Sequence, residues 1–502
     1  MKLDTRKILA MLIIVVMTLS MAAGCSKPAA EPTATSAPAA QAPAASETAT
    51  PGETKTITWA TLAGFYTDWA ETLATEYTEK TGVNIEIVQM DLPTMYEKEV
   101  LDIVGGTGNY DIITWNVSWK GEWANAGYMY PLDDFIARDA EEVDIEDFSQ
   151  AILKVSGEWN GEVYGLPYYT FTPGIFYRAD LFSDETEKTN FKAKYGYDLD
   201  IPTTYDQMSD IAEFFTRKAG DTLKGETLRQ DMYGIGLQAG RYTNIFDEIN
   251  TIAWTYGGDV IRDDGSTGVL DEPYVKAVNT YVNDLLPYAP AGSLSGSYDF
   301  VISQFNTGLI AMTGPMYLDQ WANAVLVEKN IPGSECQAAG LPGGGKTWAG
   351  AFTIGIAKST KDAEAAWGFL KYITGKEAQL KFAEGGGSTC RLSILNNKDF
   401  YSSRRDMVGH FPVLGNILED SAKNWYTNYI WITEGAKIYE EAPAWLSGAA
   451  SGEMSVDDAL KGFAEAIDGM TGGKATIYNE GVQKPASTTP YVFDKSLQLP
   501  KQ

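Results

Sequence analysis

After residue 53, the apolar positions of the chain change repeatedly between two patterns, the alternation typical of β-strands and the spacing of three to four residues typical of helices. Apolar and polar side chains alternate one by one over residues 83–88, which predicts a β-strand with one buried face. Apolar side chains recur every fourth position over residues 68–80, which predicts a helix that ends before Gly82. Residues 57–61 and 110–115 are short apolar runs typical of strands. This region is therefore predicted to be a βαβα unit with a largely parallel sheet.

The same alternation resumes farther along the chain. Residues 205–219 and 362–373 carry apolar side chains on one helical face, and residues 233–237 form a strand-like run with glycines. Ser455 and Asp458 have the spacing of a helix capping box. About 450 residues with this pattern exceed one hydrophobic core, so the predicted fold class is α/β with two lobes.

The N-terminus has the layout of an export signal. Positive charges within residues 2–7 precede an almost wholly apolar run over residues 8–21, which predicts a signal peptide over residues 1–24. Residues 19–25 resemble the lipobox of bacterial lipoproteins, in which a diacylglycerol is attached to the cysteine, here Cys25. The resemblance implies a protein outside the cytoplasm, lipid-anchored to the bacterial cell membrane. An ordinary secreted protein with an incidental cysteine is the alternative.

Residues 25–53 are interpreted as the lipidated cysteine followed by a tether. The tether is rich in Ala, Pro, Thr and Ser and has no large apolar side chain, so burial cannot offset the entropy of ordering it. We expect it to be disordered. The other two cysteines, Cys336 and Cys390, either pair in an oxidising compartment or remain buried thiols, and the sequence leaves both open.

Charge and composition exclude several classes of function. A net charge of −28 disfavours nucleic acid as a partner, because binding to phosphates depends on Lys and Arg. A single histidine, His410, excludes most Ser-His, Cys-His and multi-histidine metal chemistry. Residues 263–266 lack the spacing of a calcium loop and are better interpreted as a hairpin turn. We expect no metal and no cofactor.

Several segments, in this order and spacing, resemble the extracellular solute-binding proteins of ABC sugar importers, the family that includes maltose-binding protein. The segments are residues 162–182, 202–215, 233–237, 305–315 and 341–384. The resemblance covers nearly all of the chain after the tether, and residues 392–450 are its least diagnostic part. It implies a non-enzymatic receptor with two α/β lobes, a ligand cleft between them and an ABC permease as partner. We expect a monomer.

The resemblance also implies lobes that are discontinuous in sequence. It puts the three crossing segments near residues 169–175, 308–313 and 351–357. It assigns residues 54–171 plus 309–355 to the N-terminal lobe and residues 172–308 plus 356–502 to the C-terminal lobe.

The first candidate ligand-binding residues follow predicted strands, because open α/β sheets bind ligands at the carboxyl ends of their strands. Sugars pack on aromatic rings and need hydrogen-bonding groups around the rim. Trp115, Asn116 and Trp119 follow the strand over residues 110–115, and Thr61, Leu62 and Gly64 lie at the end of the first strand. Tyr66 is either a site aromatic or the start of a helix. One of Tyr168 and Tyr169 should face the cleft, and alternation does not say which.

Other candidates come from the resemblance. Gly314, Pro315 and Met316 resemble a segment that approaches ligand, although Met316 stands where sugar binders often have an aromatic residue. Trp254, Gly258 and Asp259 resemble a ligand-contacting segment of the second lobe; a plain turn is the alternative. Trp348 precedes the third crossing. Arg391 is the cation expected near ligand, and a structural ion pair is its alternative role.

These observations predict a receptor for a carbohydrate, meaning a monosaccharide, oligosaccharide or polyol. A receptor for a charged or compatible solute is the first alternative: Arg391 would bind a carboxylate, or the aromatic residues would cage a quaternary ammonium. An extracellular carbohydrate-active enzyme is the second, and it would need two carboxylates across one cleft.

Overall fold

Two β-sheets organise the computed structural model, which describes residues 55–501 apart from 344–346, 348, 424–426 and 479–492. Within that part the side chains of residues 65, 66 and 421–423 are not described. Cys25 and the tether therefore lie outside the described residues. The fold is mixed α/β, as the sequence predicts.

The first sheet has the strand order β2-β1-β3-β14-β6. Its strands are β1 (Thr56–Leu62), β2 (Asn84–Met90), β3 (Ile112–Trp115), β6 (Gly165–Thr170) and β14 (Ala351–Ile356). β1 pairs in parallel with β2 and β3, but β14 pairs antiparallel with β3 and β6. The parallel sheet expected for residues 57–115 is confirmed by β1, β2 and β3, and β14, a segment from far along the chain, adds an antiparallel strand beside β3.

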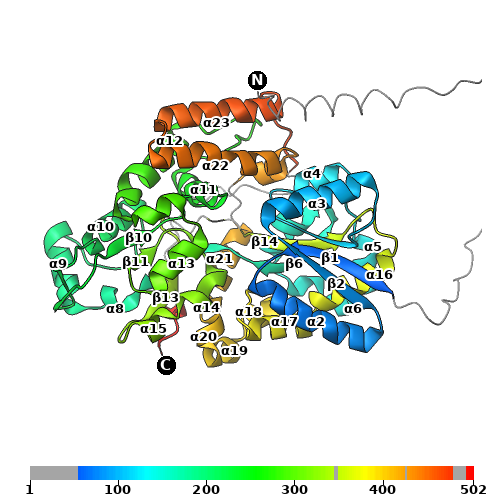
Figure 1. The fold of residues 1–502 in the computed structure, drawn as a ribbon, viewed down its shortest axis with the longest axis horizontal. Coiled ribbons are helices and arrows are strands. Elements are labelled where there is room, and N and C mark those ends of the chain that lie inside the picture. Colours follow the sequence, from blue (N-terminus) through cyan, green and yellow to red (C-terminus); the bar gives the residue numbers. More distant parts are fainter. Residues whose placement is uncertain (1–54, 344–346, 348, 424–426, 479–492, 502) are drawn as a thin grey trace, which may run out of the picture. The chain divides into compact units, whose positions relative to one another are not determined.

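Helices cover both faces of this sheet. α2 (Phe65–Thr81) and α16 (Ala363–Ile373) contact each other on one face, and α3 (Leu92–Gly105) lies on the other (Figure 1). The predicted helix end is confirmed, since Gly82 has a left-handed φ of 76° that closes α2. α16 begins after Asp362, whose carboxylate accepts the Ala365 N–H.

The second sheet contains β10 (Tyr233–Gly236), β11 (Ile310–Thr313), β7 (Pro173–Arg178) and β12 (Met316–Tyr317), in that order, and β13 (Cys336–Ala339) also pairs with β7. β11 pairs in parallel with β10, and β11, β12 and β13 are antiparallel to β7.

The longer helices of this part are α9 (Glu185–Tyr195), α10 (Tyr205–Phe215), α11 (Asn244–Tyr256), α12 (Glu272–Asn279), α13 (Tyr298–Asn306), α22 (Gly435–Ser451) and α23 (Val456–Thr471). α22 and α23 lie against α11 and α12 (Figure 1). The predicted cap of α23 is confirmed, because the Ser455 hydroxyl accepts the Asp458 N–H at 3.1 Å. Residues 263–266 form the expected hairpin turn, closed by pairing of Ile261 with Thr267.

The remaining α-helices and strands are α4 (Lys120–Asn125), α5 (Asp133–Arg138), α6 (Ala140–Val143), α7 (Gln150–Ile152), β4 (Glu158–Trp159), β5 (Glu162–Val163), α8 (Ala179–Phe182), β8 (Thr222–Leu223), β9 (Glu226–Thr227), α14 (Trp321–Ala324), α15 (Val327–Asn330), α17 (Lys376–Glu384), α18 (Leu392–Leu395), α19 (Lys398–Ser403), α20 (Arg405–Val408) and α21 (Phe411–Lys423).

The crossings between the sheets differ in part from the expected ones. The first is confirmed, because β6 ends at Thr170 in the first sheet and β7 begins at Pro173 in the second. The crossing expected at residues 308–313 is wrong, since β11 stays in the second sheet between β10 and β7. The chain returns to the first sheet between β13 and β14, just before the expected third crossing.

The lobe boundaries change accordingly. Residues 310–339 belong with the second sheet, although they were assigned to the N-terminal lobe. Residues 356–373 pack with the first sheet through α16, although they were assigned to the C-terminal lobe. The physical reason is that a buried apolar strand flanked by glycines has the same pattern in either sheet, so its partner strands decide its place.

Two further observations bear on the sequence predictions. Cys336 and Cys390 are both buried, free thiols, which decides the alternative that the sequence left open. Among the described residues, no helix is long and apolar enough to cross a membrane.

Candidate functional site

A cavity of about 720 Å³ lies where the two sheets' segments meet. Its lining is Leu62, Ala63, Asp91, Leu92, Pro93, Asn116, Tyr169, Phe171, Arg241, Tyr242, Thr243, Asn244, Ser297, Tyr298, Tyr317, Asp319, Gln320, Phe352, Tyr439, Glu440, Glu441, Pro443 and Ala444. The volume is within the range of small-molecule sites. Both the first-sheet and the second-sheet parts of the chain contribute side chains.

The first wall of the cavity is built at the carboxyl ends of the three parallel strands. Leu62 ends β1, Asp91 follows β2 and Asn116 follows β3. Asn116 is buried, and its Oδ1 accepts the backbone N–H and the hydroxyl of Ser118, both at 3.0 Å, which fixes the orientation of its amide. The carboxylate of Asp91 caps α3 by accepting the backbone N–H of Thr94 at 3.0 Å, and this bond lowers the pKa of Asp91.

Aromatic rings form a continuous array along the cavity. The ring centroids of Tyr169 and Phe352 are 5.2 Å apart, and those of Phe352 and Phe171 are 5.1 Å apart. The Phe171 ring then meets Tyr317 edge to face at 5.7 Å, and Tyr317 meets Tyr298 at 6.3 Å. Because Tyr169 and Phe352 belong to the first sheet and Tyr317 to the second, the array joins the two parts at the cavity.

The second wall is held from behind by Asp247 of α11, which is buried. Its Oδ2 accepts the phenol of Tyr317 at 2.7 Å and that of Tyr439, from α22, at 3.1 Å. The Tyr317 oxygen in turn accepts the Asn244 Nδ2–H at 2.9 Å. Burial raises the pKa of Asp247 to about 7, although both phenols oppose that shift.

The charge of the lining favours some ligand classes over others. Asp91, Asp319, Glu440 and Glu441 are acidic, whereas Arg241 is the single cation among the described lining residues. An anionic ligand would meet net repulsion here, while a neutral ligand with hydroxyl donors or a cation would find acceptors. The cavity therefore suits a neutral polyhydroxylated molecule or an amine.

Three of the residues predicted to bind ligand line this cavity, namely Leu62, Asn116 and Tyr169. The choice between Tyr168 and Tyr169 falls to Tyr169, because alternation turns Tyr168 into the core, where its ring meets Trp59 at 5.4 Å. Thr61 is buried within β1, and Gly64 precedes α2, and neither is part of the lining. The side chain of Tyr66, and all of Trp348, lie outside the described residues.

Trp115 and Trp119, the leading aromatic candidates, do not reach the cavity. The Trp115 indole is fully buried and donates from Nε1 to the Ser156 carbonyl at 2.9 Å. A Cβ on Gly165 would lie 2.2 Å from this ring, so the glycine makes room for it. Trp119 packs against Trp123 at 5.4 Å. Position after a strand fixes the backbone of a residue but not the direction of its side chain, and here the rings turn into the core.

The second-lobe candidates are also placed outside the lining. Trp254 is buried in α11. Asp259 accepts the Asn428 backbone N–H at 2.8 Å and the Thr427 hydroxyl at 3.0 Å, so it organises a turn with a distant segment. Gly258 contacts the start of α12. This matches the turn alternative.

The segment over Gly314, Pro315 and Met316 is close to the cavity but presents a different side chain to it. The Gly314 N–H donates to the Gly236 carbonyl at 2.8 Å, and Met316 is fully buried in β12. The Pro315 carbonyl accepts the side-chain amide of Gln238 at 3.1 Å. Tyr317, one residue farther, lines the cavity instead. The expected aromatic residue is thus present one position later in the chain.

Arg391 has a structural role rather than a ligand-binding one. Its guanidinium is buried, and it donates to the carbonyls of Thr374, Val143 and Asp144, each at 2.9 Å. It also lies over the Phe148 ring at 3.7 Å. The bonds use Nε and Nη1, and Asp147 lies 3.8 Å from Nη1, so the guanidinium is held within the fold and away from the cavity lining, as in the structural alternative.

The sequence missed most of the second wall. Arg241, Tyr242, Tyr298 and Tyr439 carry no local signal that separates them from surface or core residues. Tyr439 belongs to α22, within the least diagnostic part of the chain. Residues 241–243 directly before α11 are a loop at a helix start, a general feature that does not single out Arg241 or Tyr242.

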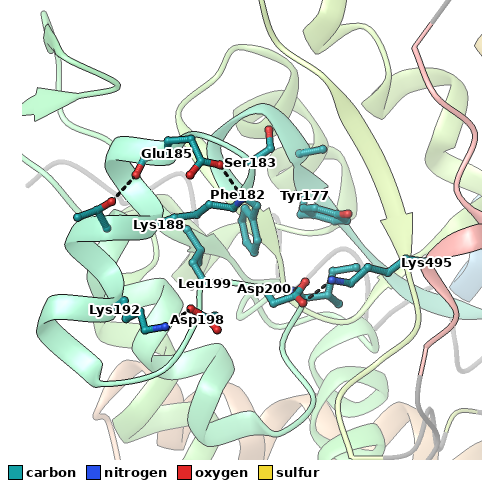
Figure 2. A pocket seen from close by; sticks show the side chains of 13 residues that line it. Tyr177, Phe182, Ser183, Glu185, Lys188, Lys192, Asp198, Leu199, Asp200 and Lys495 are labelled. Carbon is teal, nitrogen blue, oxygen red and sulfur yellow. Dashed lines mark hydrogen bonds and ion pairs between the residues drawn. The ribbon is translucent and has the colours of Figure 1, made fainter.

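A second hollow of about 620 Å³ lies beside β7 and α9 (Figure 2). Its charged side chains pair with one another: Lys188 with Glu185 at 2.9 Å, Lys192 with Asp198 at 2.9 Å, and Lys495 with Asp200. These surface ion pairs account for its charged lining, and the aromatic residues among its described lining are the single pair Tyr177 and Phe182, with ring centroids 4.9 Å apart. The larger cavity is therefore the candidate site.

Comparison with known proteins agrees with this geometry. A sequence model of the family described as "Bacterial extracellular solute-binding protein" matches residues 61–380. A maltotriose-binding protein of Pyrococcus abyssi is 24% identical over 373 residues, covering 74% of this chain and 68% of that protein. A Sinorhizobium fredii protein named "Probable amino-acid ABC transporter periplasmic-binding protein" is 22% identical over 416 residues, covering 79% and 85%.

Solved structures share the fold. An ABC transporter solute-binding protein of Agrobacterium radiobacter K84 in complex with ribitol has a TM-score of 0.69 and 21% identity, covering 83% of this chain and 98% of that one. Maltose-bound T. maritima MalE3 has a TM-score of 0.65 and 18% identity, covering 83% and 99%. Both likenesses support a two-lobe architecture for this chain.

Proposed function

Because the chain belongs to the bacterial extracellular solute-binding proteins, we propose that it captures a carbohydrate between its two lobes and delivers it to an ABC permease. The ligand class is a monosaccharide, an oligosaccharide or a polyol. The observation that carries this proposal is the cavity itself, in which an aromatic array lies beside an acceptor-rich wall. Rings suit the C–H faces of a sugar, and acceptors suit its hydroxyls.

The names of similar proteins support the ligand class. Ribitol and maltose are bound in two of the similar structures, and maltotriose is named for one relative. These compounds share neutral, hydroxyl-rich chemistry, which suits a cavity with four acids and one cation among its described lining residues.

The mechanism follows from the two-sided lining. Asn116 and Tyr169 come from the first-sheet part, and Tyr317 and Tyr439 from the second. A ligand that touches both walls at once stabilises the closed arrangement by its differential affinity for it. The permease then receives the closed, loaded protein. We propose no catalytic role, in agreement with a family of binding proteins.

We propose that the protein is held outside the cytoplasm by a lipid on Cys25 and acts as a monomer. The family is extracellular, and the N-terminal charge and apolar pattern supports export. The tether would let the folded part move near the membrane while it remains attached.

A receptor for a cationic or compatible solute is the second candidate. The acidic lining and the ring array would also suit an ammonium group, and one relative is named for amino acids. Arg391 cannot provide the cation for a carboxylate, since three backbone carbonyls occupy it. Arg241 would then be the cation that binds the carboxylate of such a ligand.

A ligand panel measured by thermal shift tests the proposal. The panel contains ribitol, D-mannitol, maltose and maltotriose against glutamate, arginine and glycine betaine. A ligand at a hundredfold excess over its Kd stabilises the native state by about 2.7 kcal/mol, which gives a measurable rise in Tm. We expect stabilisation by one or more neutral compounds, with a Kd that changes little between low and high salt. Stabilisation by the charged compounds alone, or a steep salt dependence, would favour the second candidate.

A further inference from the structure

Two adjacent buried acids on α11, Asp247 and Glu248, accept hydrogen bonds from different sets of side chains. Asp247 accepts the phenols of Tyr317 and Tyr439, which line the cavity. Glu248 accepts the Tyr281 phenol at 2.6 Å and the backbone and side-chain N–H groups of Gln238 at 2.9 and 3.2 Å. Neither Tyr281 nor Gln238 is part of the lining. The two acids therefore offer a matched comparison within one helix.

The bonding around Asp247 determines which way the cavity phenols point their protons. An ionised carboxylate only accepts hydrogen bonds, so both phenols must donate to it. Each phenol has a single O–H proton, and both phenols donate that proton to Asp247. The Tyr317 oxygen also accepts from Asn244. What the two oxygens have left for a ligand is acceptor capacity alone.

We propose that Asp247 is a positioning residue that fixes Tyr317 and Tyr439 as hydrogen-bond acceptors toward the cavity, so that this wall selects ligands with hydroxyl or ammonium donors and rejects carboxylates. The inference rests on the proposed function, because it takes the ligand to occupy this cavity. Asp319 and Glu440 add further carboxylate oxygens to the same lining. A carboxylate placed here would face acceptors without a proton to share, which is costly in a buried site.

The proposal has a pH signature with a definite sign. Asp247 faces the phenols of Tyr317 and Tyr439, lies near the phenol of Tyr429, and adjoins the carboxyl of Glu248. When Asp247 is protonated on Oδ2, the carboxyl donates to one of the two phenol oxygens, and the O–H of that phenol becomes free to donate toward the cavity. A ligand that donates to the phenols prefers the ionised acid. Affinity for a neutral ligand should therefore rise as pH increases through about 7, the pKa to which burial raises Asp247.

The test compares Asp247→Asn with Glu248→Gln. An asparagine keeps the size of the side chain. Both phenols contact the position of Oδ2, and with the amide Nδ2 in that position the side chain donates to a phenol oxygen, which frees that phenol's proton for the cavity. The probes are D-mannitol and its acid counterpart D-mannonate, together with ribitol and maltose, with Kd measured by calorimetry at pH 5.5 and pH 8.5. We expect wild type to prefer mannitol over mannonate and to bind mannitol more tightly at pH 8.5.

In Asp247→Asn the preference for mannitol should fall by about tenfold, the scale of one hydrogen bond, and the pH dependence should flatten. Glu248→Gln should keep both properties of wild type. Equal behaviour of the two variants, or an unchanged preference in Asp247→Asn, overturns the proposal and leaves the proposed function standing. Should Asp247→Asn fail to fold, Tyr317→Phe and Tyr439→Phe replace it, because each removes one acceptor and should weaken mannitol binding by a similar factor.

A ligand-free measurement separates the two levels of inference. The tyrosine doublet in ultraviolet resonance Raman spectra reports whether a phenol donates or accepts. We expect it to change between wild type and Asp247→Asn at pH 8.5. If no sugar or polyol binds wild type but the doublet changes, the proposed ligand class fails and the positioning role stands. If the doublet does not change, the positioning role is wrong whatever binds.

Discussion

Tyr242 offers a sharp test of the candidate site, because its ring lines the cavity and yet is 53% exposed. The ring precedes α11, in a loop whose backbone is fixed by a bond from the Tyr242 N–H to the Gly240 carbonyl at 2.8 Å. The buried half of this side chain contributes to folding, whereas the exposed half contributes little. A ligand that covers the ring would nevertheless remove apolar surface from water. Tyr242→Ala should therefore reduce affinity, in addition to the stability lost with the buried half of the ring.

The magnitude follows from the exposed area. A tyrosine side chain presents about 150–250 Å² when fully exposed, so about half of that is accessible here. A ligand on one face would cover about 50–100 Å², worth about 1 to 2.5 kcal/mol at ~25 cal/mol per Å². The corresponding rise in Kd is roughly 5- to 70-fold. The free energy of unfolding should fall by about 1–3 kcal/mol, because the buried half of the ring loses its contacts.

The assay measures Kd by calorimetry with the best ligand of the thermal-shift panel, and stability by urea unfolding without ligand. Tyr242→Phe keeps the ring and should retain most of the affinity. Leu270→Ala is the matched control, since Leu270 is 47% exposed but does not line the cavity: it should also lower stability but leave Kd unchanged. A Tyr242→Ala protein that binds as tightly as wild type would show that ligand does not cover this ring.

Three further outcomes are expected. Trp115→Phe should lower the free energy of unfolding by about 1–3 kcal/mol, since it removes a buried hydrogen bond and part of a packed ring. The Kd of the folded protein for its ligand should stay the same. A changed Kd would indicate that Trp115 contributes to ligand binding. Burial raises the pKa of Asp247 to about 7 and that of Glu248 to about 8, above their values in the unfolded chain. The folded state therefore holds more protons, and the free energy of unfolding should fall as pH rises from about 4 to 8. Denaturation curves of an Asp247→Asn, Glu248→Gln double variant should show a flatter dependence of stability on pH. Cys25→Ala should lose partition into the detergent phase, and equal partition of variant and wild type would refute lipidation there.

Local interactions explain what could be predicted from the sequence. The alternation over β2, the fourfold spacing of α2 and the cap at Ser455 all depend on residues within a few positions of one another. The carboxyl ends of β1 and β3 follow from the same local reading, which is why Leu62 and Asn116 were placed correctly at the cavity. The family followed from the order of several such segments.

The predictions that failed depend on contacts between distant residues. Trp115 was expected at the site, but Gly165 and Gly355, far along the chain, leave the space that its ring fills. Arg391 has the chemistry of a ligand-binding cation, and only the folded chain brings the carbonyls of Val143, Asp144 and Thr374 to it. A side chain's chemistry is local, whereas its partners are not.

The sequence by itself therefore determined the α/β elements, the family and two residues at the strand ends of the first wall, Leu62 and Asn116, because strand ends and helix caps are set by neighbouring residues. Only the tertiary structure decided the second wall. Tyr317 and Tyr439 stand 122 positions apart, and they become one surface because both phenols reach the same carboxylate of Asp247. No periodicity along the chain encodes that convergence, since it arises when β12, α11 and α22 pack together and the buried acid must be satisfied.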